Sequence, residues 1–112
     1  MKTIKGSLKV REDANTLTRE VAELLEKLLA ENSLRPADLH AVLLSATDDL
    51  PGVFLEEAAS ELGLDAVSVY TVQQFRYQAD MDRCVQMVLY PKALEHEPVD
   101  LLLGCESWGS EL

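Results

Sequence analysis

Amides and one lysine are the side chains best suited to hold a small molecule by directed hydrogen bonds. Gln73 and Gln74 end one run of alternating apolar and polar residues, and Gln86 lies inside the next such run. An amide offers both a donor and an acceptor, and a buried amide needs partners for them. Lys5, inside an alternating segment near the N-terminus, adds positive charge. The pattern predicts a ligand with carbonyl, hydroxyl or ether groups and at most one carboxylate. The alternative is that the amides only tie strands together at an interface.

The other side chains that could take part in a site are less clearly indicated by the sequence. Arg76 and Arg83 lie close in sequence to the amides and can add cations to the same site. Cys84 and Cys105 have no metal-ligand spacing, and we expect both to be reduced thiols. Glu95-His96-Glu97 is a run of adjacent residues, which rarely aim at one ion. We therefore expect neither a metal nor a cofactor.

Length and charge limit the possible partners. The 112 residues suit a single domain, 1–112, whose segment 104–112 reads as a tail. The net charge of -10 argues against binding to nucleic acid or to an anionic membrane surface. No apolar run approaches the roughly 20 residues of a membrane span, and the N-terminus lacks a signal-peptide pattern. We expect a cytoplasmic protein that completes its core by oligomerisation.

Periodicity predicts a mixed α/β (α+β) fold, with a sheet that has helices on one side. A helix is expected at about 16–32, where leucines and a valine recur at i, i+3, i+4, i+7 and i+8, and a shorter one at 53–62. The expected strands are 3–10, 40–46, the two runs within 66–90, and 99–103, with a helical turn at 36–38.

The two runs within 66–90 are expected to form the central pair of strands, joined by a long loop. This would place Gln74 and Gln86 on neighbouring strands. In the second run Cys84, Gln86 and Val88 share one face of the strand, so Gln86 is a polar group on a strand that otherwise looks buried.

Several strings, taken with this element order, resemble the small α/β class of chorismate mutase, the trimeric enzyme that converts chorismate to prephenate. They are Ile4-Lys5-Gly6, LLEKLLAEN, LLSATDDL followed by Val53-Phe54, V-x-V-x-x-x-Q ending at Gln73, and Cys84 within its strand. The resemblance implies a homotrimer with a pseudo-barrel core and a small-molecule site in a cleft at each subunit interface.

The resemblance also implies which residues line that cleft. Phe54 and Cys84 match the family, and Lys5 keeps the charge of an arginine. The family has an arginine where Ser60 stands, a glutamate where Gln74 stands, an arginine where Gln86 stands, and a tyrosine near Leu101. Catalytic roles would then fall to Gln86, Gln74 and Lys5. Substrate contacts would come from Phe54, Ser60, Gln73, Arg76, Arg83, Cys84 and Leu101.

Three hypotheses follow. The first is an enzyme of chorismate mutase fold whose amide-lined cleft acts on a less anionic cyclic or enol-ether molecule. The second is a genuine chorismate mutase with displaced cations. The third is a non-catalytic trimer that binds or scaffolds. The loss of charged groups at matched positions weighs against the second, because a neutral donor stabilises developing negative charge less than a charged one. The three glutamines that remain favour the first over the third, since random decay of a site would leave apolar or mixed residues.

Overall fold

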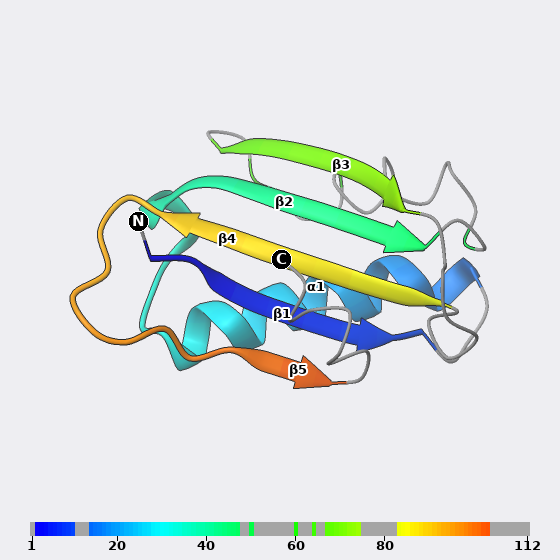
Figure 1. The fold of residues 1–112 in the computed structure, drawn as a ribbon, viewed down its shortest axis with the longest axis horizontal. Helices are drawn as coiled ribbons and strands as arrows, with labels where there is room; N and C mark the ends of the chain where they lie inside the picture. The colour runs from blue at the N-terminus through cyan, green and yellow to red at the C-terminus, as the bar shows by residue number, and fades with distance from the viewer. Residues whose placement is uncertain are drawn as a thin grey trace.

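A five-stranded sheet with one long helix packed against one of its faces makes up the described part of the chain (Figure 1). The computed structural model describes residues 2–10, 14–47, 50, 60, 64, 67–74 and 83–103, without the side chains of 14–17 and 74. The strands are β1 Ile4–Lys9, β2 Leu39–Thr47, β3 Ser68–Gln74, β4 Cys84–Pro91 and β5 Leu101–Leu103. The helices are α1 Ala14–Glu31 and the 3-10 helix η1 Pro36–Asp38. The mixed α/β sheet expected from the sequence is therefore confirmed.

The strand order is β3-β2-β4-β1-β5, with β4 antiparallel to both β1 and β2 at the centre. The outer strands pair in parallel, β3 with β2 and β5 with β1. The expectation that the two runs within 66–90 form the central pair is wrong, because β2 lies between β3 and β4. β3 pairs with the edge of β2 opposite to β4. Because β2 and β3 are parallel, a crossover connection must join them.

The apolar face of α1 packs on the side chains that alternate strand residues present. Its buried residues are Val21, Leu24, Leu25, Leu28 and Leu29, which are the positions expected from the spacing. Gly6 of β1 lies under the helix, and a Cβ atom there would stand 2.7 Å from Leu28 Cδ1. The absence of a side chain at Gly6 thus lets α1 approach the sheet closely.

The C-terminal end of α1 is closed by backbone hydrogen bonds. The N–H of Ser33 donates to Ala30 and that of Leu34 to Leu29, with Ser33 at a φ of 55°. This is the Schellman arrangement, in which the residue after the helix takes the left-handed conformation. Pro36 then opens η1, so the predicted helical turn at 36–38 is confirmed.

Asn32, at the end of α1, joins the helix to the C-terminal segment. Its side chain is 1% exposed and donates to the carbonyl oxygens of Leu28, at 2.8 Å, and Val99, at 3.0 Å. Its oxygen accepts from the Val99 N–H at 2.9 Å. The amide therefore binds the Val99 backbone as a neighbouring strand would, and holds the chain just before β5.

Both edges of the sheet carry exposed apolar side chains. Tyr70 and Val72 on β3 are 59% and 43% exposed, and Leu102 and Leu103 on β5 are 36% and 52% exposed. The edges are those of β3 and β5 in Figure 1. Strand edges with exposed apolar groups are surfaces that another chain can cover.

The predicted second helix and the predicted tail fall mostly on residues that the structure does not describe. The predicted helix 53–62 lies outside the described residues except Ser60, whose backbone is helical, and the predicted tail 104–112 lies outside them altogether. No helix among the described residues is long and apolar enough to cross a membrane.

Candidate functional site

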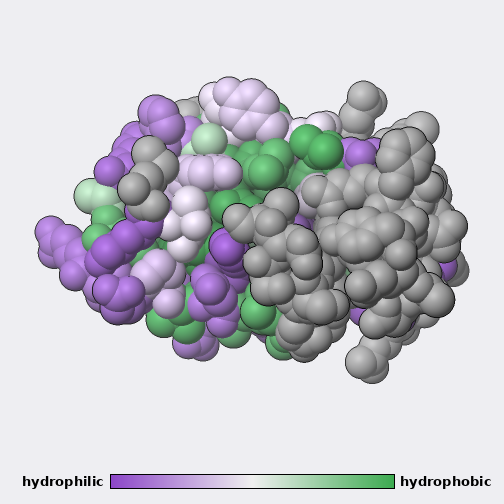
Figure 2. All heavy atoms as spheres, in the orientation of Figure 1, coloured by the Kyte–Doolittle hydropathy of each residue, from purple (hydrophilic) through white to green (hydrophobic). Residues whose placement is uncertain are grey.

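The face of the sheet turned away from α1, here called the far face, carries the polar side chains singled out in the sequence. Register places the following on it: Lys5, Ser7 and Lys9 of β1; Ala41, Leu43, Ser45 and Thr47 of β2; Tyr70 and Val72 of β3; and Cys84, Gln86, Val88 and Tyr90 of β4. Figure 2 looks onto this face, with hydrophobic side chains in the middle of the visible surface and hydrophilic ones at the end where the chain begins.

A polar row crosses the three central strands. Ser7 of β1 pairs with Gln86 of β4, which pairs with Ser45 of β2. Exposure is 0% for Ser7 and Gln86 and 2% for Ser45. Gln86 has partners in the structure, although its Oε1 is buried and accepts no hydrogen bond from the described residues. The sequence-based expectation of a buried amide at Gln86 is thus met.

Lys5 lies diagonally beside Gln86 on the same face. Lys5 pairs with Val88, two residues along β4 from Gln86. Diagonal neighbours on adjacent strands lie within reach of long side chains. Lys5 is half-buried, and its backbone N–H donates to Asp100 Oδ1 at 2.8 Å. The Lys5 and Gln86 side chains thus lie close together on this face, with Lys5 partly exposed and Gln86 fully buried in the single chain.

Cys84 and Thr47 continue the polar side chains toward one end of the far face. The backbone N–H of Cys84 donates to Thr47 Oγ1 at 3.0 Å, and both residues are fully buried. Cys84 is disulfide-bonded, so the expectation of a reduced thiol there is wrong. The same expectation for Cys105 lies outside the described residues. A cysteine in a disulfide has no S–H to donate to a ligand.

Arg83 is held by the backbone at the end of β1. Its Nε donates to the Val10 carbonyl at 2.9 Å, while the Val10 N–H donates to the Arg83 carbonyl. The φ of Arg83 is 55°, a left-handed conformation uncommon for a residue with a Cβ atom. This arrangement ties the start of β4 to the end of β1 and gives part of the guanidinium a structural role.

The paired glutamines lie at the end of β3. Gln73 is exposed on the side of α1, where its Nε2 donates to the Leu50 carbonyl at 3.2 Å. The backbone of Gln74 pairs with that of Thr47. Gln74 and Gln86 were expected on neighbouring strands. This expectation is wrong, because β2 separates β3 from β4.

Of the remaining predicted residues, Leu101 lies on the opposite face of the sheet from Lys5 and Gln86. Leu101 pairs with Gly6 and packs against the hydrophobic core, so it lies on the α1 side of the sheet. Ser60 is exposed. Phe54 and Arg76 lie outside the described residues.

The sequence interpretation did not single out Ser7, Ser45 or Thr47. The signal that could have found them is their alternation: Ser45 and Thr47 share one face of a strand, and Ser7 shares a face with Lys5. Hydroxyls at alternate positions in otherwise apolar strands indicate a polar face. No cluster of three or more metal-binding side chains occurs among the residues that the structure describes.

Comparisons with known proteins agree with this fold. The family model described as chorismate mutase type I matches residues 1–100. Chorismate mutase AroH from Bacillus subtilis is 33% identical over 88 residues, covering 77% of this chain and 69% of that protein. Chorismate mutase AroH from Thermus thermophilus is 28% identical over 87 residues, covering 76% of this chain and 71% of that protein.

A solved structure is similar in fold. A chorismate mutase from Clostridium thermocellum superposes with a TM-score of 0.80 at 17% identity, and both chains are fully covered. The family match spans β1 to β4, ends just before β5, and includes Lys5 and Gln86. On this evidence the chain belongs to the chorismate mutase type I family.

Proposed function

We propose that this protein converts chorismate to prephenate at a site on the far face, with Lys5 and Gln86 as the groups that meet the reacting ether oxygen. The observation that carries the proposal is their diagonal position on adjacent central strands, in a chain of this family. The two relatives named chorismate mutase support the reaction itself.

The chemistry needs donors more than it needs a nucleophile. The rearrangement breaks one C–O bond while it forms one C–C bond, and negative charge builds on the ether oxygen. A preorganised donor that meets this oxygen stabilises the transition state more than the ground state. The Lys5 ammonium supplies charge from a flexible stem, and the Gln86 amide supplies a directed N–H from a fixed strand position.

Local positive charge is needed at the site because chorismate carries two carboxylates. The chain as a whole carries a net charge of -10, which repels anions. Lys5 places positive charge on the far face at β1, where it opposes that repulsion locally. A neutral amide at Gln86 stabilises developing charge less than the arginine implied by the family resemblance, so we expect turnover below that of enzymes with the full cationic set.

The same proposal includes assembly into a homotrimer whose subunits complete each site. The exposed apolar residues lie on two different edges, β3 and β5, which favours a contact between unlike surfaces. Such contacts close into rings when the rotation between subunits permits. A ring of three would cover both edges of every sheet and place a neighbouring chain beside the far face.

The test follows chorismate loss by absorbance in the trimer, whose mass is checked by light scattering. Lys5→Met keeps the stem and removes the charge, and we expect kcat/KM to fall by about 10²–10³-fold. Gln86→Leu should lower it by about ten- to a hundredfold through the lost hydrogen bond. Lys9→Met is the matched control, because Lys9 lies on the same strand and face but is exposed.

Each failure has a distinct meaning. Chorismate turnover no faster than in buffer, from an intact trimer that chorismate nevertheless stabilises against heat, would refute the mutase and favour the amide-lined enzyme acting on another ligand. Equal losses in Lys5→Met and Lys9→Met would refute the assignment of Lys5. A monomer at micromolar concentration would refute the shared site.

A further inference from the structure

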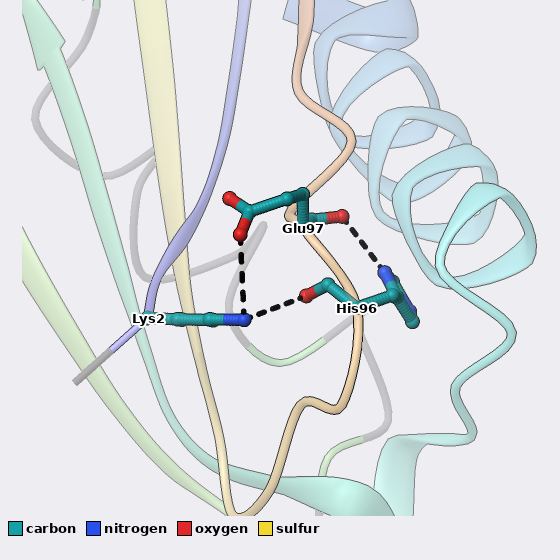
Figure 3. A network of polar contacts seen from close by, with 3 residues as sticks. All are labelled: Lys2, His96 and Glu97. Carbon is teal, nitrogen blue, oxygen red and sulfur yellow. Dashed lines mark hydrogen bonds and ion pairs between the residues drawn. The ribbon is translucent and has the colours of Figure 1, made fainter.

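Outside the far face, His96 lies in a network of polar contacts that joins three segments of the chain. In Figure 3, Lys2 reaches toward His96 and Glu97 from the segment before β1. Lys2 Nζ donates to the His96 carbonyl at 3.3 Å and lies 3.7 Å from Glu97 Oε1. His96 Nδ1 lies 2.8 Å from the Glu97 carbonyl oxygen and His96 Nε2 lies 3.0 Å from that of Asn32. One imidazole thus bridges the C-terminal segment and the end of α1.

Both ring nitrogens of His96 face a backbone carbonyl oxygen. A carbonyl oxygen can only accept a hydrogen bond, so each ring nitrogen must donate to make its contact. A neutral imidazole has one N–H, whereas the imidazolium has two. The geometry is therefore satisfied in full only when His96 is protonated.

The end of a helix also favours a cation at this position. Carbonyl oxygens in the last turn of an α-helix carry partial negative charge. The last turn of α1 contains no basic residue, and Asn32 directly follows it. Protonated His96 therefore brings positive charge to the helix terminus from a segment 64 residues further along the chain.

We propose that His96 is a protonation-dependent latch that holds the segment 96–103, and with it β5, against the C-terminal end of α1. Asn32 makes the part of this junction that does not titrate, through its amide contacts with Val99. His96 makes the part that does. Because Asp100 accepts a hydrogen bond from the backbone of Lys5, the latched segment also lies against the strand that carries the proposed catalytic cation.

The charged groups around His96 come from several elements. Lys2 precedes β1, Asp38 lies in η1, Lys92 follows β4, and Glu95 and Glu97 share the segment of His96. Asn32 and Ser33, from the end of α1, are uncharged. Asp38 is paired with Arg35, whose Nη2 lies 3.6 Å from Asp38 Oδ1, so the charged groups that act most directly on His96 are Lys2 and Glu97.

The pKa of His96 agrees in direction with this geometry. The hydrogen bond to the Glu97 carbonyl, and after it the bond to the Asn32 carbonyl, raises the pKa above the ordinary value. A raised pKa in the folded state means that the latch contributes fully below the ordinary value of about 6.5, and that its contribution is lost as pH rises through the folded value. The segment should be held at mildly acidic pH and loosen above it.

The experiment uses the full chain and both histidines. Nitrogen chemical shifts of the imidazole rings should report two N–H groups on His96 at acidic pH and a pKa above that of an unfolded peptide. Hydrogen-exchange protection factors of Val99 and Leu101 to Leu103 should fall by about two- to fivefold between about pH 6 and about pH 8, the range expected for one charge at a helix end.

Two variants separate the latch from a general effect of pH. His96→Gln offers a donor that does not titrate, so its protection factors should stay level across this range. His40→Gln, which changes the other histidine, an exposed residue of β2, should keep the wild-type profile. A His96 pKa at or below that of the unfolded peptide would overturn the proposal. So would a fall in protection that persists in His96→Gln.

Discussion

Changing Asn32 to aspartate tests whether one buried amide holds the C-terminal segment to α1. Asn32→Asp keeps the shape of the side chain but removes both N–H donors, which face the carbonyl oxygens of Leu28 and Val99. Leaving a buried polar group without its partner costs about 1–3 kcal/mol. The Leu28 contact is buried and the Val99 contact is part-buried, so we expect the free energy of unfolding to fall by about 2–4 kcal/mol.

Urea denaturation followed by circular dichroism measures this loss. The control is Ser33→Asp, which adds the same charge one residue further on, at an exposed site whose left-handed backbone aspartate tolerates. The control should lose less than about 1 kcal/mol, the range of an unfavourable charge at a helix end. Equal losses in the two variants would refute the hydrogen-bond argument. At acidic pH the loss of unfolding free energy in Asn32→Asp should approach that in the control, because the introduced carboxyl regains one donor when protonated.

Three further substitutions test the packing and the backbone. Gly6→Ala should lower the free energy of unfolding by about 1–3 kcal/mol because the new methyl group meets Leu28; an unchanged urea midpoint would mean that α1 shifts freely. Ser33→Gly should raise it by about 0.5–1 kcal/mol by relieving the left-handed conformation, and a loss in thermal melts would contradict this. Thr47→Val should cost about 1–2 kcal/mol, since the buried Cys84 N–H loses its acceptor; an unaltered melting temperature would show that another acceptor replaces it.

Alternation and helical spacing predicted which residues face the core. The apolar stripe of α1 and the shared face of Cys84, Gln86 and Val88 appear in the structure as expected. Such patterns depend on neighbours along one chain segment, and the side-chain period within a segment follows from backbone geometry. Strand order is a different kind of information. The insertion of β2 between β3 and β4 depends on a crossover that no local period encodes.

Contacts between distant segments were the other part that sequence reasoning missed. Asn32 reads as an ordinary polar residue at a helix end, yet its amide pairs with Val99, 67 residues away. The disulfide of Cys84 was missed because a strand cysteine usually reads as a small buried hydrophobe. The buried position of Gln86 was predicted, but its placement beside Ser7 and Ser45 needed the register of three strands.

The position of β1 in the sheet has a consequence for how the chain folds during synthesis. β1 is made first among the strands, but its two neighbours, β4 and β5, are made last. At the usual 5–20 residues per second, about 75 residues and on the order of 10 s separate Lys9 from Cys84 on the ribosome. Until then β1 has neither edge paired, and the apolar stripe of α1 has little of the sheet to cover it.

Pairing of such distant segments makes folding slow, since a large loop must close before any contact rewards it. The nascent N-terminal third therefore exposes a hydrophobic helix and an unpaired strand for seconds, a state prone to aggregation or chaperone binding. The acidic residues on the outer side of α1, Glu23, Glu26 and Glu31, are exposed in the folded protein and would also keep that early segment soluble. Of the five strands described, β1 would thus be the first to emerge from the ribosome and among the last to gain its partners.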